Sequence, residues 1–185
     1  MVEDKIILGI DPGTNVLGYG LIQIKGTKIS LINFGIVQLS KLGNHPDKLK
    51  RIYDRLVGII DEFHPDEIAI EAPFFGKNVQ SMLKLGRAQG VAIAAGLSRN
   101  IPFEEYSPRR IKQSITGSGN ASKEQVAAML QKLLTFDELP KYLDATDGLA
   151  VAVCHHFSKG VGEHNKVKGG GWASFLSSNP DKIKK

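Results

Sequence analysis

A short apolar run near the N-terminus limits the possible folds of this chain to those with a buried strand that ends on an acid. Residues 6–14 read Ile-Ile-Leu-Gly-Ile-Asp-Pro-Gly-Thr. Five largely apolar residues fit a strand that is covered on both faces, and the Pro-Gly pair cannot continue it. In sheets with parallel pairing, ligands gather at the carboxyl ends of strands, so Asp11 is a candidate catalytic or metal-binding acid. Ordinary turn chemistry is the alternative, because Asp before Pro-Gly is common in turns, and further acids must decide between the two.

The length and composition predict a single domain followed by a tail. A chain of 185 residues is long enough to bury a proper core, and its one cysteine, Cys154, excludes a disulfide framework. The N-terminus lacks a signal-peptide pattern, and no run of residues is long and apolar enough to span a bilayer. We therefore expect a cytoplasmic protein without a membrane partner.

The charge is unevenly distributed along the chain. The net charge is +5, but residues 77–132 carry 9 Lys/Arg against 3 Asp/Glu, whereas residues 1–76 carry 8 against 10 and residues 133–158 carry 1 against 4. A basic block between acidic flanks suits an enzyme that holds a polyanion with one surface and metal ions with another. An ordinary solvated surface explains the charge alone equally well.

The first half of the chain predicts a mixed sheet. Strands are expected over 17–25 and 28–39, so the chain opens with an antiparallel meander of three strands. Apolar residues at helical spacing predict a helix over 47–63, and the short strand 68–71 that follows again ends on an acid, Glu71. A right-handed crossover places this strand parallel to the first and alongside it. Asp11 and Glu71 are then expected at the same edge of the sheet.

The second half is mainly helical. A helix over 79–100 is rich in small residues, which could let it approach either the sheet or the equivalent helix of a second subunit. The remaining expected elements are a strand over 103–106, a helix starting at Ser107-Pro108, a break over 117–120, a helix to Leu134 that Ser122 and Gln125 open with a capping box, and a last helix over 143–157.

The last helix supplies two further acids. Asp144 and Asp147 are three residues apart, which stacks their carboxylates on one face near the N-terminus of the helix. Capping is the alternative for Asp144, whereas Asp147 lies beyond the cap on the face that leads to a core-directed Val151.

The end of the chain reads differently. His155 and His156 are expected to interact favourably with the C-terminus of the last helix, and not with a metal. Residues 1–158 form the expected domain, and residues 159–185 read as a basic, disordered tail in which Trp172 is unexplained.

Four acids in one patch predict a metal site. If the topology is right, Asp11, Glu71, Asp144 and Asp147 repel one another unless they share a cation such as Mg²⁺, which prefers oxygen ligands. Two such ions could clamp the attacking water and the leaving oxygen of a phosphodiester, so hydrolysis of a nucleic-acid backbone follows.

Five segments of the chain, in order, resemble segments of one family, the RuvC Holliday-junction resolvases. They are ILGIDPGTNVLGYG, IAIEAPFFGKN, LKLGRAQGVAIAA, PRRIKQSITGSGNASKEQV and DATDGLAVAVCHH, and they run from about residue 5 to 158. The resemblance implies an α/β, RNase H-like fold with three antiparallel strands, then parallel strands, flanked by helices. It also implies a homodimer with two active sites that nicks opposed strands of a four-way DNA junction during recombination and repair. Mg²⁺ is the implied cofactor, two ions per site, with Mn²⁺ as a substitute, and RuvA and RuvB are the implied partners at the nucleoid.

The resemblance also carries over individual site residues. Asp11, Glu71, Asp144 and Asp147 match the four catalytic, metal-binding acids, although some relatives have His at the position of Asp144. Phe74 matches an aromatic residue that stacks on a base at the junction, and its neighbour Phe75 is expected in the core. The basic residues divide into two groups: Lys112 and Lys123 match positions near the scissile phosphate, and Lys77, Lys84, Arg87, Arg109 and Arg110 are candidates for contacts with the DNA backbone.

Three other functions compete with this interpretation. A sugar-kinase or actin-like domain also carries Asp-x-Gly in its first hairpin, but it needs a second domain for which 185 residues leave no room. A non-catalytic DNA-structure binder would have no need for acids at both Asp11 and Glu71. A ribonuclease H proper shares the fold and the metals, so only its cleavage of an RNA–DNA hybrid would distinguish it.

Overall fold

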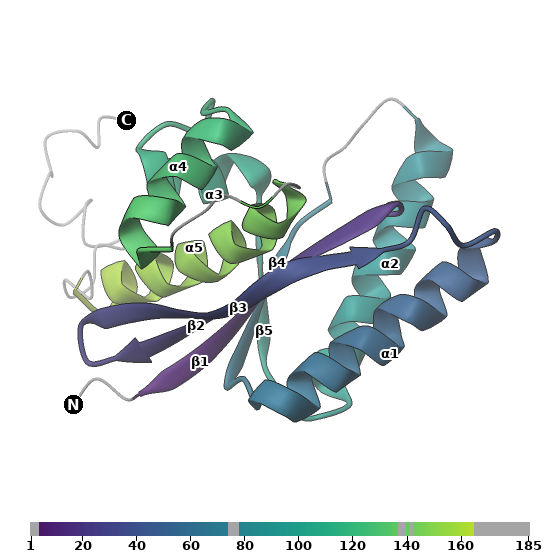
Figure 1. Cartoon of the computed structure of the whole chain (residues 1–185), viewed down its shortest axis with the longest axis horizontal. Coiled ribbons are helices and arrows are strands. Elements are labelled where there is room, and N and C mark those ends of the chain that lie inside the picture. The colour runs from purple at the N-terminus through teal and green to yellow at the C-terminus, as the bar shows by residue number, and fades with distance from the viewer. Residues whose placement is uncertain (1–3, 74–77, 137–139, 141–142, 165–185) are drawn as a thin grey trace, which may run out of the picture.

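The computed structural model describes residues 4–73, 78–136, 140 and 143–164. The elements in chain order are β1 (Lys5–Asp11), β2 (Val16–Lys25), β3 (Lys28–Gln38), α1 (His45–Phe63), β4 (Glu67–Glu71), α2 (Val79–Leu97), β5 (Phe103–Tyr106), α3 (Pro108–Thr116), α4 (Lys123–Leu134) and α5 (Asp144–His164). The strands form one sheet in the order β3-β2-β1-β4-β5, with helices on both faces (Figure 1). The predicted mixed α/β architecture is confirmed.

The pairing of the strands agrees with the predicted topology. β1 pairs antiparallel with β2, and β2 pairs antiparallel with β3, so the first three strands are a meander. β4 returns after α1 and lies parallel to β1, with Ile10 opposite Ile70. Because Asp11 and Glu71 each follow one residue later, the two acids end neighbouring strands.

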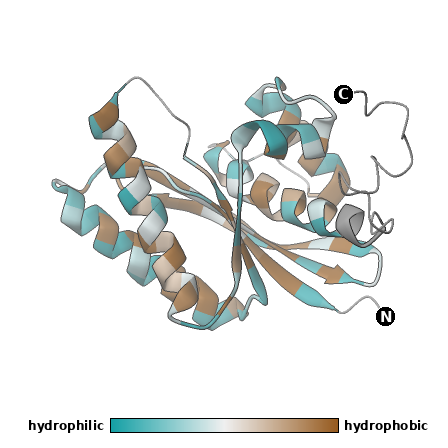
Figure 2. Cartoon of the chain, turned by 180° about the vertical axis from the view of Figure 1, so that it is seen from behind, coloured by the Kyte–Doolittle hydropathy of each residue, from teal (hydrophilic) through white to brown (hydrophobic). Residues whose placement is uncertain are grey.

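Alternation along the strands divides the core into two layers. Side chains such as Ile7, Ile22 and Ala69 are buried on the face that packs against α3, α4 and α5. Their neighbours, such as Leu8 and Ile68, are buried on the face that packs against α1 and α2. Figure 2 shows hydrophobic residues running along the strands between the two helical layers. Strands buried on both faces explain why the first apolar run has no polar interruption.

Local capping signals explain where most helices begin. Asn44 caps α1 by accepting a hydrogen bond from the backbone N–H of Asp47. Ser107 caps α3, and Pro108 is its first residue, as predicted. The capping box predicted between Ser122 and Gln125 is present at the start of α4. α2 ends at Leu97, three residues before the expected end, and Asn100 then takes a left-handed conformation with φ of 58°.

Helix α5 is longer than predicted, and this corrects the interpretation of its two histidines. It continues to His164, whereas the sequence suggested an end at Phe157. His155 and His156 therefore do not lie at the C-terminus of the helix. His155 is 1% exposed, and its ring nitrogens are 2.8 Å from the Tyr106 hydroxyl and 2.7 Å from Glu67 Oε2. It belongs to the core between α5 and the start of β4.

Glycines let α5 lie in backbone contact with the sheet. A Cβ atom at Gly9 would be 2.2 Å from the carbonyl oxygen of Gly148, and one at Gly20 would be 2.5 Å from Leu149 Cα. A Cβ at Gly18 would be 2.0 Å from the carbonyl oxygen of Asp144. Because real Cβ atoms do not come this close, only glycine permits the observed depth of α5 at these positions.

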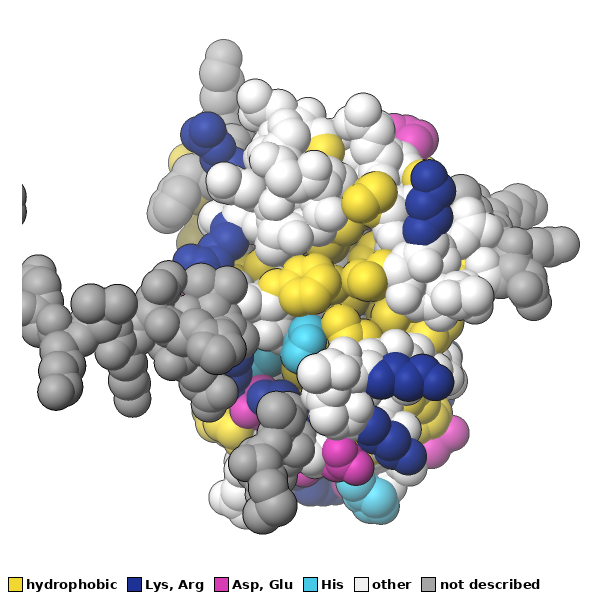
Figure 3. Space-filling view, turned by 90° about the vertical axis from the view of Figure 1, so that its left-hand side faces the viewer, with side chains coloured by type: hydrophobic (Ala, Val, Ile, Leu, Met, Phe, Trp, Pro, Cys, Tyr) yellow, Lys and Arg dark blue, Asp and Glu magenta, His cyan; other side chains and the backbone are white. Residues whose placement is uncertain are grey.

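The side of the molecule away from the acids has a partly hydrophobic surface (Figure 1 and Figure 3). The side of the molecule at the left of Figure 1 has hydrophobic side chains near its centre, with Lys and Arg side chains around them (Figure 3). Asp11 and Glu71, at the far ends of β1 and β4, lie at the opposite end of the sheet.

Within the part of the chain that the structure describes, no helix has the length and apolarity that crossing a membrane requires.

Candidate active site

Three of the four predicted acids meet at one edge of the sheet. Asp11 is the last residue of β1 and Glu71 is the last residue of β4. The alternation of both strands turns these side chains toward α5, whose first turn carries Asp144 and Asp147. Asp11, Glu71 and Asp147 line one pocket of about 80 Å³. The topology that the sequence predicted therefore brings these carboxylates together.

Asp144 lies at the rim of this pocket. Its side chain is 43% exposed, against 15% for Asp147, and it does not belong to the pocket lining. The difference follows from helical geometry, because residues three apart lie on nearly the same face but one turn apart in depth. Asp144 is thus the most weakly placed of the four acids in the described structure.

Two lysines complete the pocket, and both were predicted. Lys112 of α3 and Lys123 of α4 line the pocket beside the acids. Lys123 Nζ donates a hydrogen bond to Asp147 Oδ2 and lies 3.4 Å from Asp144 Oδ1. Burial works against the charge of Lys123, but the bond to Asp147 and the attraction of the nearby acids outweigh it and raise the pKa of the lysine. Lys123 therefore stays charged and partly balances the acids.

The acids themselves are unusually hard to ionise in this setting. Burial, followed by repulsion from Glu71 and Asp147, raises the pKa of Asp11 well above its ordinary value. Burial and the charge of Asp147 raise the pKa of Glu71 to about 7. Burial also raises the pKa of Asp147, although Lys123 opposes this effect. A cation beside the three carboxylates would remove the repulsion and restore their charged forms.

The donor set fits a hard metal ion. Carboxylate oxygens at the ends of β1 and β4 and on α5 are the ligands that Mg²⁺ and Mn²⁺ prefer. As the side chains stand, no three Asp, Glu, His or Cys residues in the described ranges gather their ligating atoms around one point. Instead, the ammonium of Lys123 lies between Asp144 and Asp147. The expectation of a metal ion at this site therefore rests on the oxygen ligands and the negative charge of these residues, and not on a preformed coordination geometry.

Of the other predicted DNA contacts, none that the structure describes lines the acid pocket. Phe74, its neighbour Phe75 and Lys77 lie outside the described residues. Lys84 and Arg87 are exposed on α2.

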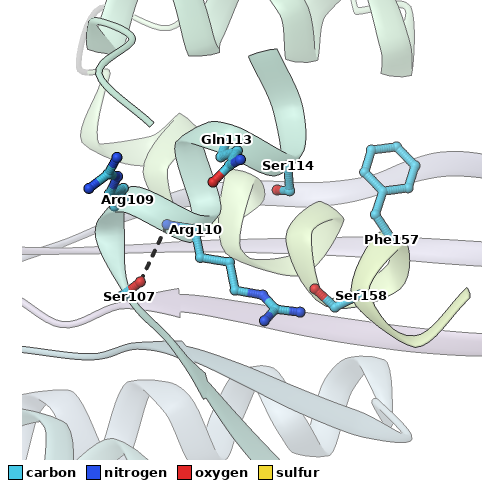
Figure 4. Close-up of a pocket in the computed structure, with 7 residues that line it drawn as sticks. All are labelled: Ser107, Arg109, Arg110, Gln113, Ser114, Phe157 and Ser158. Atoms are coloured by element: carbon cyan, nitrogen blue, oxygen red, sulfur yellow. Dashed lines mark hydrogen bonds between the residues drawn. The ribbon is translucent and has the colours of Figure 1, made fainter. Parts of the chain in front are cut away.

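Arg109 and Arg110 line a separate groove of about 520 Å³ between α3 and α5, together with Ser107, Gln113, Ser114, Phe157 and Ser158 (Figure 4). The guanidinium of Arg110 lies over the ring of Tyr106, 5.7 Å from its centre. α3 thus presents Lys112 to the acids and its two arginines to the groove.

The sequence interpretation missed how the acids are brought to their depth. Gly9 and Gly18, which allow α5 to approach the sheet, carry no functional group and were not singled out. The apolar wall of the pocket, formed by Ile111, Val126 and Ala150, was also missed. The sequence feature that could have revealed the role of Gly9 is its spacing from Asp11, because residues two apart on a strand face the same side of the sheet.

Taken together, the order of the sheet and the acids at its edge define an RNase H-like nuclease. Comparison with known proteins specifies the family. The family model described as crossover junction endodeoxyribonuclease RuvC matches residues 7–155. The chain therefore belongs to the RuvC family of crossover junction endodeoxyribonucleases.

Individual relatives agree with this assignment. The protein of this name from Cytophaga hutchinsonii is 65% identical over 181 residues, which cover 98% of this chain and 89% of the relative. The one from Christiangramia forsetii is 61% identical over 182 residues, which cover 98% and 94%. The structure of Thermus thermophilus RuvC in complex with a Holliday junction substrate superimposes with a TM-score of 0.79 at 32% identity, covering 85% of this chain and 96% of that chain.

Family membership decides among the functions that the sequence left open. The chain is a metal-dependent endonuclease that acts in the resolution of Holliday junctions. This match over nearly the whole chain is not explained by the three alternatives, which were a sugar-kinase or actin-like domain, a non-catalytic DNA-structure binder and a ribonuclease H proper.

Proposed function

We propose that Asp11, Glu71, Asp144 and Asp147 are the catalytic residues with which this chain cuts opposed strands of a four-way DNA junction. In this proposal the four acids hold Mg²⁺, two ions per site, and Mn²⁺ can replace it. The meeting of Asp11, Glu71 and Asp147 with Lys112 and Lys123 in one pocket is the observation that carries the proposal. Sites that combine perturbed acids with a specific cationic partner are candidates for catalysis.

In the proposed site, charged residues and apolar residues have different roles. Bound divalent ions supply stabilisation of the charge on the phosphodiester and lower the pKa of the attacking water. The ammonium of Lys112 suits the charge that develops on the scissile phosphate. The apolar wall of Ile111 and Val126 keeps water from part of the pocket, so each of these charges acts more strongly than it would in bulk solvent.

One exposed face of α2 supports the proposal of a homodimer. Val79, Leu83 and Leu97 are more than half exposed on this helix. Gly86 and Gly90 lie between them in sequence, and a Cβ atom at either glycine would meet nothing within 4 Å. A helix with apolar side chains and bare backbone on one face can approach a second copy of itself closely. Sedimentation of Leu83→Asp should give a monomer, and a variant that remains dimeric would place the interface elsewhere.

Several family properties remain part of the proposal. Phe74 is assigned to stacking on a base at the crossover, and Lys77, Lys84, Arg87, Arg109 and Arg110 to the DNA backbone. A fluorescent base analogue at the crossover should brighten less with Phe74→Ala than with the wild type, and an equal rise would reassign the stacking residue. RuvA and RuvB are the proposed partners. Because the substrate is a DNA junction, the proposed location is the nucleoid in the cytoplasm. Residues 159–164, which the sequence assigned to the basic tail, belong to α5, and Lys159 pairs with Glu67, so the proposed tail outside the nuclease domain is 165–185.

Substitution of single acids tests the assignment. Asp11→Asn and Glu71→Gln should abolish cleavage of a four-way junction while binding survives, because the basic surface is intact. Asp61→Asn is a matched control, since this exposed acid pairs with Arg99 far from the pocket. Either site variant cutting at more than about a tenth of the wild-type rate, a barrier change below roughly 1.4 kcal/mol, would remove that residue from the mechanism.

A further inference from the structure

The first turn of α1 is tied to the loop that follows Asp11. Lys48 Nζ donates hydrogen bonds to the carbonyl oxygen of Thr14 at 2.9 Å and to Asn15 Oδ1 at 3.2 Å. Both acceptors belong to the connection between β1 and β2, so the ammonium lies at the catalytic edge of the sheet. Neither acceptor is an anion, so these bonds orient the ammonium without neutralising its charge.

Three more basic side chains gather at this place. His45 lies one turn before Lys48 on α1, and Lys84 and Arg87 belong to α2, which packs against α1. The packing of α1 against α2 brings these side chains toward one another, and burial, followed by the charges of Arg87, Lys84 and Lys48, lowers the pKa of His45. We call these four residues the α1–α2 basic cluster.

The cations of the cluster form no ion pair with the carboxylates that the structure describes. Within the described ranges, none of Lys48, Lys84 and Arg87 has a carboxylate within ion-pair distance. The nearby first-turn acid, Asp47, instead accepts a hydrogen bond from Asn44 Nδ2 at 2.8 Å. His45 Nε2 is buried without a hydrogen-bond partner among the described atoms.

The other end of the same helix pair is built differently. There, Arg99 Nε, just beyond α2, pairs with Asp61 Oδ1 of α1 at 2.7 Å. Like charges that face one another across a helix contact raise the energy of the fold unless an anion joins them. The grouping of cations at the catalytic end therefore indicates a site for an anion.

We propose that the α1–α2 basic cluster binds backbone phosphates of a DNA arm other than the one whose strand is cut. The cluster belongs to the α1 and α2 face of the sheet, whereas Asp11, Glu71 and Asp147 line a pocket with Lys112 and Lys123 on the opposite face. In a four-way junction, the arms diverge from the crossover. While the strand to be cut is held at the acids, the backbone of a second arm can therefore run along α1 and α2. The inference rests on the proposed function, because the acids define where the crossover is held.

The test measures the salt dependence of DNA binding in an Asp11→Asn background. Lys84→Gln with Arg87→Gln removes two exposed charges of the cluster, and anisotropy in EDTA follows binding to a four-way junction and to a linear duplex of equal arm length. Loss of two phosphate contacts should make the slope of log K against log salt shallower by about 1.8 for the junction, about 0.9 per contact. The duplex slope should change much less.

A matched double variant separates this effect from a general loss of charge. Lys50 and Arg99 lie on or next to the same helices but are paired with Asp54 and Asp61, so Lys50→Gln with Arg99→Gln should leave the junction slope unchanged. A change below about 0.5 in the cluster variant, or an equal change in the control, would overturn the site. An equal change on the duplex would overturn its assignment to a separate arm. Failure of the proposed function would appear independently, as junction cutting by the Asp11→Asn parent.

Discussion

Replacing Gly9 with alanine should damage the active site without touching any catalytic residue. The new Cβ would lie 2.2 Å from the carbonyl oxygen of Gly148 and 2.4 Å from the backbone nitrogen of Ala152, both in α5. Ordinary contact begins near 3.4 Å, so α5 must move away from β1 by about 1.2 Å (3.4 − 2.2). The helix carries Asp144 and Asp147 with it, while Asp11 stays on β1.

This displacement of α5 should lower both the stability of the protein and its cleavage rate. Overpacking of a tight contact costs about 1 to 3 kcal/mol in the free energy of unfolding. A misplacement near 1 Å at a reacting centre can lower the rate about 10²-fold. Gly9→Ala should therefore remain folded in urea titration, with reduced stability, and lose about two orders of magnitude in the single-turnover rate of junction cleavage.

Gly58→Ala is the matched control. A Cβ atom there would meet nothing within 4 Å, on an exposed position of α1. Alanine should stabilise this helix by about 0.5 to 1 kcal/mol and leave cleavage unchanged. If Gly9→Ala cut within about threefold of the wild-type rate, the depth of α5 would not be what positions the acids, and the reasoning from these contacts would be refuted.

Two further predictions concern a lysine and a histidine. Lys112→Ala should lower the cleavage rate more than the junction affinity, because a lysine at the scissile phosphate acts mainly on developing charge; equal losses in single-turnover rate and in titrated affinity would reduce it to a binding residue. Burial lowers the pKa of His155 below its ordinary 6.5, so the unfolded chain binds a proton at this residue more readily than the folded protein does. The contribution of neutral His155 to the free energy of unfolding is therefore fully present above pH 6.5 and is lost as the pH falls below that value. Urea titrations at pH 8 and pH 5 should show this loss, and an equal loss in His155→Gln would assign it to other groups.

Much of the active site was predictable because its geometry depends on local periodicity. Residues two apart on a strand share a face, so the sequence indicates that Asp11 and Glu71 point to the same side once their strands are parallel neighbours. The capping signals at Ser107 and Ser122 likewise act within three residues. Interactions of this range are readable from the order of the residues alone.

The extent of α5 was not predictable in the same way. Gly160 and Gly162 each disfavour a helix by about 1 kcal/mol, so the sequence suggested an end before them, yet the helix continues to His164. His155 was therefore misjudged as a helix-end residue, although its partners Tyr106 and Glu67 are 49 and 88 residues away in the chain. Contacts over such separations exist only once the sheet has formed.

The sequence by itself determined the order of the elements, the mixed sheet and the acids that its parallel strands bring to one edge. Only the tertiary structure decided the depth of α5, the exposure of Asp144 at the rim, the position of Arg109 and Arg110 in a separate groove, and the contact of Lys48 with the loop after Asp11. The reason is physical: periodicity specifies which face a residue takes on its own element, whereas the distance and rotation between two elements result from close packing of side chains and backbone that are remote in sequence.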